Sequence, residues 1–255
     1  MKNVKFPALL VLVMVLSLSA AAQNEQKAPA KVKKGWNFGP LPAIGYNSDL
    51  GFQYGALTDI FYFGDGSRFP EYIHKFNVEV SQYTKGTGVY HLFYDSKHLL
   101  KGIRTTLDVS YLTDKMMDFT GFNGFMSQYD PGFALENPSY YKIDRRLMRA
   151  TADFQGPIGG NWSWAAGIGV YGYKTGEVRL EKYAGADNLY SHYVNAGLIE
   201  QEEADGGTKL ELKAGIVHDT RDNEADPTKG IWSEAIFFGS PGAQSYLKLS
   251  LVHRG

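Results

Sequence analysis

The sequence predicts an all-β fold: a transmembrane antiparallel β-barrel of about ten strands. Three observations predict it. They are an export signal at the N-terminus, apolar and polar residues that alternate with a period of two, and strand-like segments of about ten residues with aromatic residues at their ends. A tilted strand needs ~9–11 residues to cross a bilayer, whereas strands of globular proteins average ~5–6. The length of the segments therefore favours a membrane barrel over a soluble sandwich.

Residues 1–22 have the order of a secretory signal peptide. Two lysines precede an unbroken apolar run over residues 8–18, and small residues follow it up to Ala22. This run is about half as long as the ~20 residues of a membrane-spanning helix. The chain has no cysteine, which excludes a bacterial lipoprotein. We expect a cleavage site that includes Ala20 and ends at Ala22, and export through Sec to the outer membrane of a Gram-negative bacterium.

The composition of the chain excludes several other classes. The absence of cysteine excludes a disulfide-stapled scaffold, and 26 basic against 27 acidic residues give no basic stripe for a nucleic acid. With 17 Tyr, 15 Phe and 29 Gly the chain still has a negative mean hydropathy, which is typical of β-structure that is wet on one side. Residues 23–35 are polar and aperiodic, and predict a disordered periplasmic lead-in.

Residues 36–255 predict one outer-membrane β-barrel domain. Ile103 to Tyr111 illustrates the alternation: Ile, Thr, Leu, Val and Tyr occupy one face, and Arg, Thr, Asp and Ser occupy the other. The predicted strands are 36–47, 50–63, 73–84, 88–95, 102–113, 142–155, 162–174, 208–219, 231–239 and 244–254.

The lengths of the connections predict which end of the barrel faces outward. Barrels of this kind have short periplasmic turns and long extracellular loops. If the N-terminus is periplasmic, the two longest connections, 114–141 and 175–207, both lie outside. The turns 156–160 and 220–230 then lie in the periplasm, where the connections 64–72 and 96–101 are longer than expected.

Charged residues on the polar strand faces predict a solvated lumen wall. They form either a passive wall or an ion-pair network that stiffens the lumen or tunes the selectivity of a pore. The lumen-facing charges are Arg104, Asp108, Arg145, Arg149, Asp153, Glu211 and Lys213.

No pattern predicts catalysis, a cofactor or a metal site, so we expect no enzymatic activity. Residues 167–172 match Gly-x-Gly-x-x-Gly but lie inside an alternating strand, where a nucleotide motif does not belong. His218 and Asp219 are adjacent in a strand and should point to opposite faces. The acidic run after residue 218 lacks the spacing of a calcium loop, and turn chemistry accounts for it better.

The stretch from 219 to 230 has the pattern Asp-x-Arg-Asp followed by Pro-Thr-x-Gly, with Asp219, Arg221, Asp222, Pro227 and Gly230 at the defined positions. It resembles a periplasmic turn of the Omp85 superfamily, which includes BamA- and TamA-like proteins and bacterial surface antigens of the D15 type. Residues 42–55 and 119–124 are similar to an opening hairpin and a loop in short members of that superfamily.

This resemblance implies a sixteen-stranded barrel that assembles outer-membrane proteins or translocates polypeptides. The implied partners are outer-membrane lipids and unfolded outer-membrane protein clients, with no nucleic acid. The chain departs from the superfamily in lacking POTRA domains and the Val-Arg-Gly-Phe tetrapeptide. We therefore expect a short form, C-terminally incomplete. The alternatives are a passive porin-like channel and, less favoured because no Ser-His pairing is visible, an outer-membrane phospholipase.

Overall fold

The computed structural model describes residues 31–48, 50–122, 128–224, 226–242 and 245–255. The predicted signal peptide, with Ala20 and Ala22, and most of the predicted lead-in lie outside these ranges. Contacts between residues divide the chain into Met1–Lys33 and Lys34–Gly255, and every helix and strand below belongs to the second unit.

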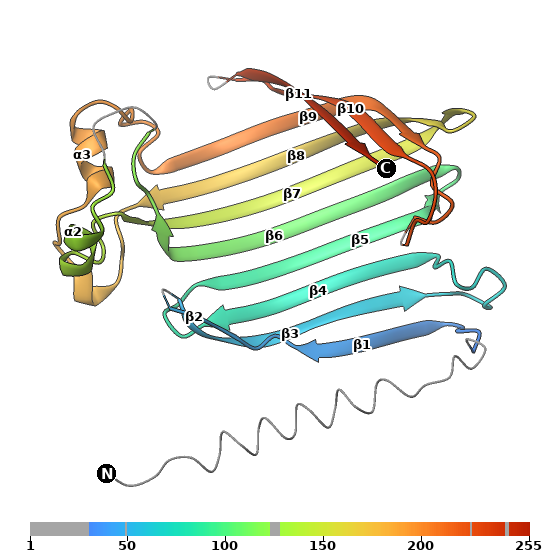
Figure 1. The fold of residues 1–255 in the computed structure, drawn as a ribbon, viewed down its shortest axis with the longest axis horizontal. Helices are drawn as coiled ribbons and strands as arrows, with labels where there is room; N and C mark the ends of the chain where they lie inside the picture. Colours follow the sequence, from blue (N-terminus) through green and yellow to red (C-terminus); the bar gives the residue numbers. More distant parts are fainter. Residues whose placement is uncertain (1–30, 49, 123–127, 225, 243–244) are drawn as a thin grey trace, which may run out of the picture. The chain divides into compact units, whose positions relative to one another are not determined.

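Eleven strands form one antiparallel sheet, which confirms the all-β prediction. Strands that follow one another in the sequence pair in the sheet, in the order β1-β3-β4-β5-β6-β7-β8-β9-β10-β11, with β2 also on β3 (Figure 1). The strands are β1 (Trp36–Pro42), β2 (Gly45–Asn47), β3 (Gly51–Tyr62), β4 (His74–Tyr83), β5 (Gly88–Leu100), β6 (Ile103–Asp118), β7 (Lys142–Gly159), β8 (Trp162–Gly176), β9 (Gly206–Asp219), β10 (Trp232–Ser240) and β11 (Tyr246–Arg254).

The predicted strand 36–47 is interrupted and forms both β1 and β2. The two pieces pair with β3 in a single register, with Pro42 opposite Ala56 and Gly45 opposite Gln53. The gap follows Pro42, which has no N–H to donate to the ladder. The sheet thus has eleven strands where ten were predicted, although the path of the chain is unchanged.

Strand β5 runs five residues beyond its predicted end through an irregularity at Ser96. The hydroxyl of Ser96 donates to the Ile73 carbonyl at 2.7 Å and accepts the N–H groups of His98 and Leu99, both at 3.0 Å. The β5–β6 connection is therefore Lys101-Gly102 alone. The expectation of a long connection at 96–101 was wrong, because the bulged residues stay in the strand.

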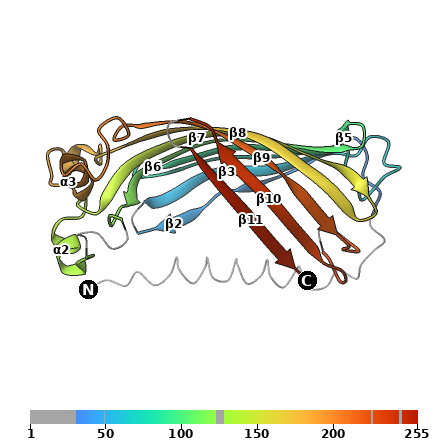
Figure 2. The same cartoon turned by 90° about the horizontal axis from the view of Figure 1, so that it is seen from above.

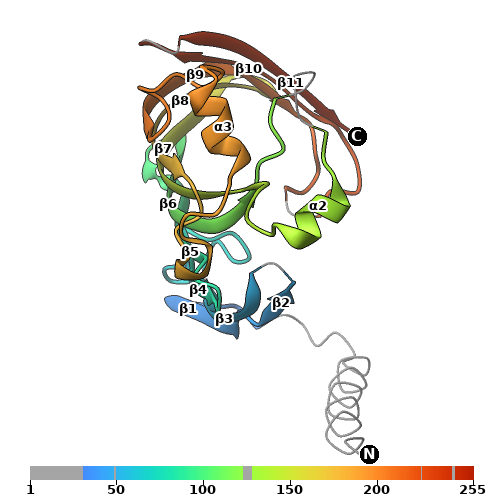
Figure 3. The same ribbon diagram turned by 90° about the vertical axis from the view of Figure 1, so that its left-hand side faces the viewer.

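The sheet is curved and does not close. Viewed end-on in Figure 3, it bends as an open arc from β1 and β3 to β10 and β11. Asp153 of β7 contacts Lys213 of β9 at 2.6 Å across Gly167 of the intervening β8. Side chains two strands apart converge only on the concave side of a bent sheet. The face that carries Asp153 is therefore concave, and the alternating apolar face is convex.

The two long loops lie at the same end of the sheet (Figures 1 and 2) and pack on each other. The β6–β7 loop contains α2 (Pro131–Glu136), and the β8–β9 loop contains η1 (Glu181–Tyr183) and α3 (Leu189–Asn195). Tyr141, Leu189 and Tyr193 form their shared buried core. The Asn188 amide donates to the Ser139 and Lys142 carbonyls at 3.0 and 2.8 Å, which fixes one loop to the other.

Within the described ranges, no helix is long and apolar enough to cross a membrane.

Candidate functional site

The β9–β10 connection, residues 220–231, lies at the end of the sheet opposite the long loops and is rich in polar contacts. We call it the strap. The Arg221 guanidinium donates to both carboxylate oxygens of Asp219, at 2.9 and 2.8 Å, and the Arg221 N–H donates to the same side chain at 3.1 Å. This bidentate pair turns the chain sharply where β9 ends.

Asp222 closes the strap on itself. Its carboxylate accepts the N–H groups of Thr228 and Lys229 at 2.9 and 3.1 Å and the Thr228 hydroxyl at 2.5 Å. These hydrogen bonds, the Thr228 hydroxyl first, lower the pKa of Asp222 to about 2. The carboxylates of the predicted turn therefore accept hydrogen bonds from backbone N–H groups that lie beyond the ends of β9 and β10.

Gly230 is required where the strap re-enters the sheet. Its φ is +95°, and a Cβ on it would lie 2.2 Å from the Thr220 carbonyl oxygen. We expect Gly230→Ala to lower the free energy of unfolding of the refolded protein by roughly 1–3 kcal/mol, measured by thermal unfolding in detergent. Gly160→Ala is the matched control, because Gly160 has φ +56° and open space around it. Equal losses in both variants would show that the contact with Thr220 has no effect.

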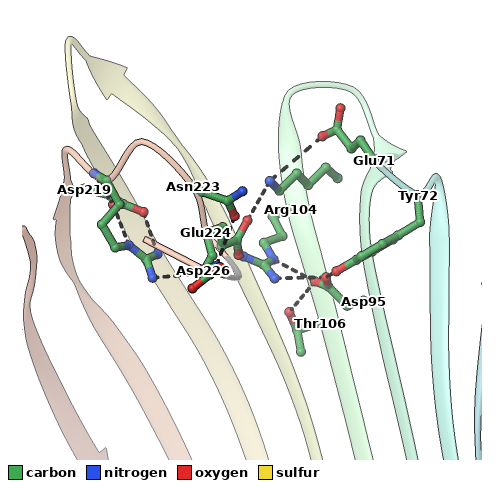
Figure 4. A network of polar contacts seen from close by, with 11 residues as sticks. Glu71, Tyr72, Asp95, Arg104, Thr106, Asp219, Asn223, Glu224 and Asp226 are labelled. Atoms are coloured by element: carbon green, nitrogen blue, oxygen red, sulfur yellow. Dashed lines mark hydrogen bonds and ion pairs between the residues drawn. The ribbon is translucent and has the colours of Figure 1, made fainter. Parts of the chain in front are cut away.

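The strap folds back over the sheet and is held on β5 and β6 by Glu224 (Figure 4). Lys97 donates to the Glu224 carboxylate at 2.8 Å, and Arg104 makes a short hydrogen bond to its other oxygen. Arg104 also donates to both oxygens of Asp95, at 2.7 and 2.9 Å. One guanidinium thus joins a strap that follows β9 to strands three and four positions away in the sheet.

Asp95 is the buried centre of this network, with 1% of its side chain exposed. Besides Arg104 it accepts hydrogen bonds from Tyr72 at 2.5 Å and Thr106 at 3.3 Å. Burial and the hydrogen bond that it donates to Asp95 raise the pKa of Tyr72. Tyr72 therefore remains a hydrogen-bond donor at every physiological pH.

Glu224 remains ionised in the strap. Burial raises its pKa, but the hydrogen bonds and charges of Lys97 and Arg104 outweigh burial, so its pKa lies below the ordinary 4.5. A carboxylate whose pKa is lower in the folded state stabilises that state above the unfolded pKa. This contribution is lost as the pH falls through the lower folded value.

A hollow of about 430 Å³ lies beside the strap. Its lining combines charged side chains with the β7–β8 turn: Lys97, Arg104, Gln155, Asn161, Asp219, Arg221, Glu224 and Trp232 are among its residues. It is open and polar, and it belongs to the concave side of the sheet.

The seven charges predicted to face a lumen all lie on the concave face. Asp108 accepts hydrogen bonds from His91 and Arg149, both at 3.0 Å. Glu211 accepts hydrogen bonds from two tyrosines on β8 and β11, and Arg145 stands opposite Asp114 in the ladder. The other three are Arg104 in the network of Asp95, and Asp153 and Lys213 in their mutual ion pair.

The glycine pattern at 167–172 lies inside β8, as predicted. Gly167 has a packing role there, since a Cβ on it would lie 2.1 Å from the Asp153 carboxylate. His218 packs its ring 4.5 Å from the Trp162 ring on the convex face, whereas Asp219 binds Arg221. The two neighbours therefore have separate partners.

The sequence did not single out Tyr72, Asp95 or Lys97. Asp95 stood at the predicted end of a strand, and Lys97 lay in a segment predicted to be a loop. The sequence does contain a signal for them: polar residues continue beyond Asp95, and Arg104 follows near the start of the next strand. Their convergence on Glu224 depends on the curvature of the sheet, which local patterns do not report.

The convex face carries a wide band of exposed apolar side chains. Each of the following is more than a third exposed: Val80, Leu92, Leu107, Val109, Ile168, Val170, Leu212, Ile216, Phe237, Leu249 and Leu251. A contiguous exposed apolar surface of this kind is typical of a face that contacts lipid or another protein.

Aromatic residues border this band at both ends. At the strap end, Trp36, Tyr62 and His74 form a row with ring centroids 4.8 and 5.9 Å apart. At the loop end, Tyr90 and Tyr111 stack at 6.1 Å. Aromatic rows at both edges of an apolar band are typical of strands that cross a bilayer.

A meandering antiparallel sheet with an apolar convex face and a charged concave face defines the class of membrane β-barrels. A solved structure with a similar fold is that of BamA from Haemophilus ducreyi lacking POTRA domains 1–3, at a TM-score of 0.46 and 16% identity. The similarity covers 86% of this chain and 37% of that chain, so this chain spans little more than a third of its length. No family model and no curated protein matches the sequence.

Proposed function

We propose that this chain forms part of the wall of a β-barrel in the outer membrane of a Gram-negative bacterium. The convex apolar band with its two aromatic borders carries the proposal. Tyr62 is the last residue of β3, and Tyr54 lies eight residues before it on the same face of the strand. That separation is ~27 Å along the strand, and a tilt of ~40° reduces it to ~20 Å, close to the ~25 Å apolar band of such barrels.

We further propose that the barrel acts without catalysis, in the assembly of outer-membrane proteins or the translocation of polypeptides. The support is the strap, in which every residue of the Asp-x-Arg-Asp and Pro-Thr-x-Gly pattern except Pro227 has a contact or backbone geometry described above. This turn is held by its own hydrogen bonds and is also attached to β5 and β6. We take that construction as support for a role beyond connecting β9 to β10.

The test uses the full chain refolded in detergent and inserted into phosphatidylcholine vesicles. Heat-modifiable migration on a gel is the expected sign of a folded membrane barrel, and a chain that stays soluble without detergent would overturn the first proposal. Vesicles with the protein should then accelerate the insertion of an unfolded eight-stranded reporter barrel, compared with empty vesicles. No acceleration would overturn the assembly role.

A passive pore is the second candidate, and the concave ion pairs favour it. Asp108 with Arg149 and Asp153 with Lys213 would line an aqueous path. In the same vesicles a pore releases a trapped small dye without accelerating insertion of the reporter. If reversing the charge of Lys213 changes the rate at which the dye is released, the dye passes along the concave face.

A further inference from the structure

The convex face is not apolar throughout. Among the described residues that the ladder register places on this face, Lys, Arg, Asp and Glu occur only on β6, β7 and β8, near the end that carries the long loops. They are Asp118, Lys142, Asp144, Arg146 and Lys174. The strap end of the same face has none of these four residue types in register. The two borders of the apolar band therefore differ in charge.

Arg146 and Lys174 are directly opposite each other in the β7–β8 ladder. Opposed residues on one face have Cβ atoms ~5 Å apart, and like charges in that position destabilise a sheet. Lys142 and Asp118 neutralise each other at 2.5 Å, and Asp144 pairs with Arg146, so one positive charge of the two facing cations stays unbalanced. An anion that contacts both would remove the repulsion.

Asp144 holds Arg146 in place and offsets one of the positive charges of the site. Asp144 is buried and lies 3.4 Å from the Arg146 Nε, which leaves the outer guanidinium nitrogens available. Gly176 lies opposite Asp144, and a Cβ on it would be 3.4 Å from an Arg179 guanidinium nitrogen. A third cation thus lies over the same patch. Across the part of the chain that the structure describes, Arg146 and Lys174 have no other ionic partner.

We propose that Arg146, Lys174 and Arg179 bind the phosphate groups of a phosphorylated lipid in the outer leaflet. The inference rests on the proposed outer-membrane location. The cations border an apolar band, so the ligand that fits has acyl chains along the band and phosphate at its edge. The patch lies at the end with the long loops, which in such barrels is the extracellular side. Arginine suits phosphate because it donates two parallel hydrogen bonds.

The test titrates the detergent-refolded full chain with lipid A, a bis-phosphorylated lipid, and follows binding by native mass spectrometry. Each cation near a lipid surface contributes about a fivefold change in affinity. We expect Lys174→Gln to weaken binding about fivefold and the double variant Arg146→Gln/Lys174→Gln roughly thirtyfold. Arg146→Lys keeps the charge beside the buried Asp144 and should lose less than Arg146→Gln. Lys174 is exposed, so its variant tests the site even if variants of Arg146 do not refold.

The matched control is Lys209→Gln/Lys248→Gln, which removes two positive charges from the concave face. It should bind lipid A as the unchanged protein does. Dephosphorylated lipid A should bind as weakly as the double variant, and inorganic pyrophosphate should compete poorly. Equal loss in the control, no loss in the Lys174 variant, or full competition by pyrophosphate would overturn the site. A protein that shows heat-modifiable migration but fails these tests keeps the membrane proposal and loses only the lipid site.

Discussion

Replacing Arg104 with Ala is expected to destabilise the refolded protein by about 3 kcal/mol or more. The side chain of Asp95 is 1% exposed, and Arg104 supplies two of its hydrogen bonds. Removing one partner of a buried ion pair typically costs ~3–5 kcal/mol, because the remaining charge stays desolvated. The free energy of unfolding follows from thermal or denaturant unfolding in detergent.

Two further variants separate the buried pair from the strap contact. Glu224→Gln removes the ion pairs with Lys97 and Arg104 but leaves Asp95 paired, so it should cost only ~0–1 kcal/mol. Both changes should speed hydrogen exchange of the backbone amides in the strap. Lys101→Ala, an exposed substitution in the β5–β6 turn, is the control. If Arg104→Ala is as stable as that control, the network makes no contribution to folding.

A lysine at position 249 is expected to destabilise the membrane-inserted protein by roughly 2–4 kcal/mol. Leu249 is 48% exposed on the convex face, where the proposed location places it against lipid. A lysine on the lipid face of a barrel costs this much at the bilayer midplane, and less near the interfaces. The loss should appear when folding into phosphatidylcholine vesicles is measured against denaturant.

Ser250→Lys is the matched substitution, because the next residue of the same strand lies on the concave face. Ser250 is half-buried and faces the polar concave side, so its replacement by lysine should cost less than that of Leu249. Equal stability of the two lysine variants in vesicles would contradict contact between the convex face and lipid.

Period-two alternation was enough to predict most of the sheet. The predicted strand 162–174 differs from β8 by two residues, and 73–84 differs from β4 by one at each end. Strands β5, β6 and β7 run beyond their predicted ends, and the first predicted strand is divided. Two of these differences have local causes. Pro42 removes a donor and divides the first strand, and the hydroxyl of Ser96 keeps bulged residues in β5. Neither effect changes the alternation that was used for prediction.

The site was less predictable than the strands. The turn residues Asp219 to Gly230 were recognised from their order, because Asp, Pro and Gly have local backbone roles. The partners of Glu224 were not, since Arg104 lies 120 residues away in the sequence. That contact exists because a curved sheet brings its separated strands close on one side, which is a property of the assembled sheet.

The strap has a mechanical consequence for the curved sheet. Glu224 connects the β9–β10 turn to β5 and β6 across the concave side of the sheet. This contact fixes the distance between those strands at one rim of the sheet. At the other rim, Asn188 connects the β8–β9 loop to the β6–β7 loop and to the first residue of β7. Flexural stiffness should therefore be highest from β5 to β10, and we expect the largest bending motions in β1 to β4 at the loop end.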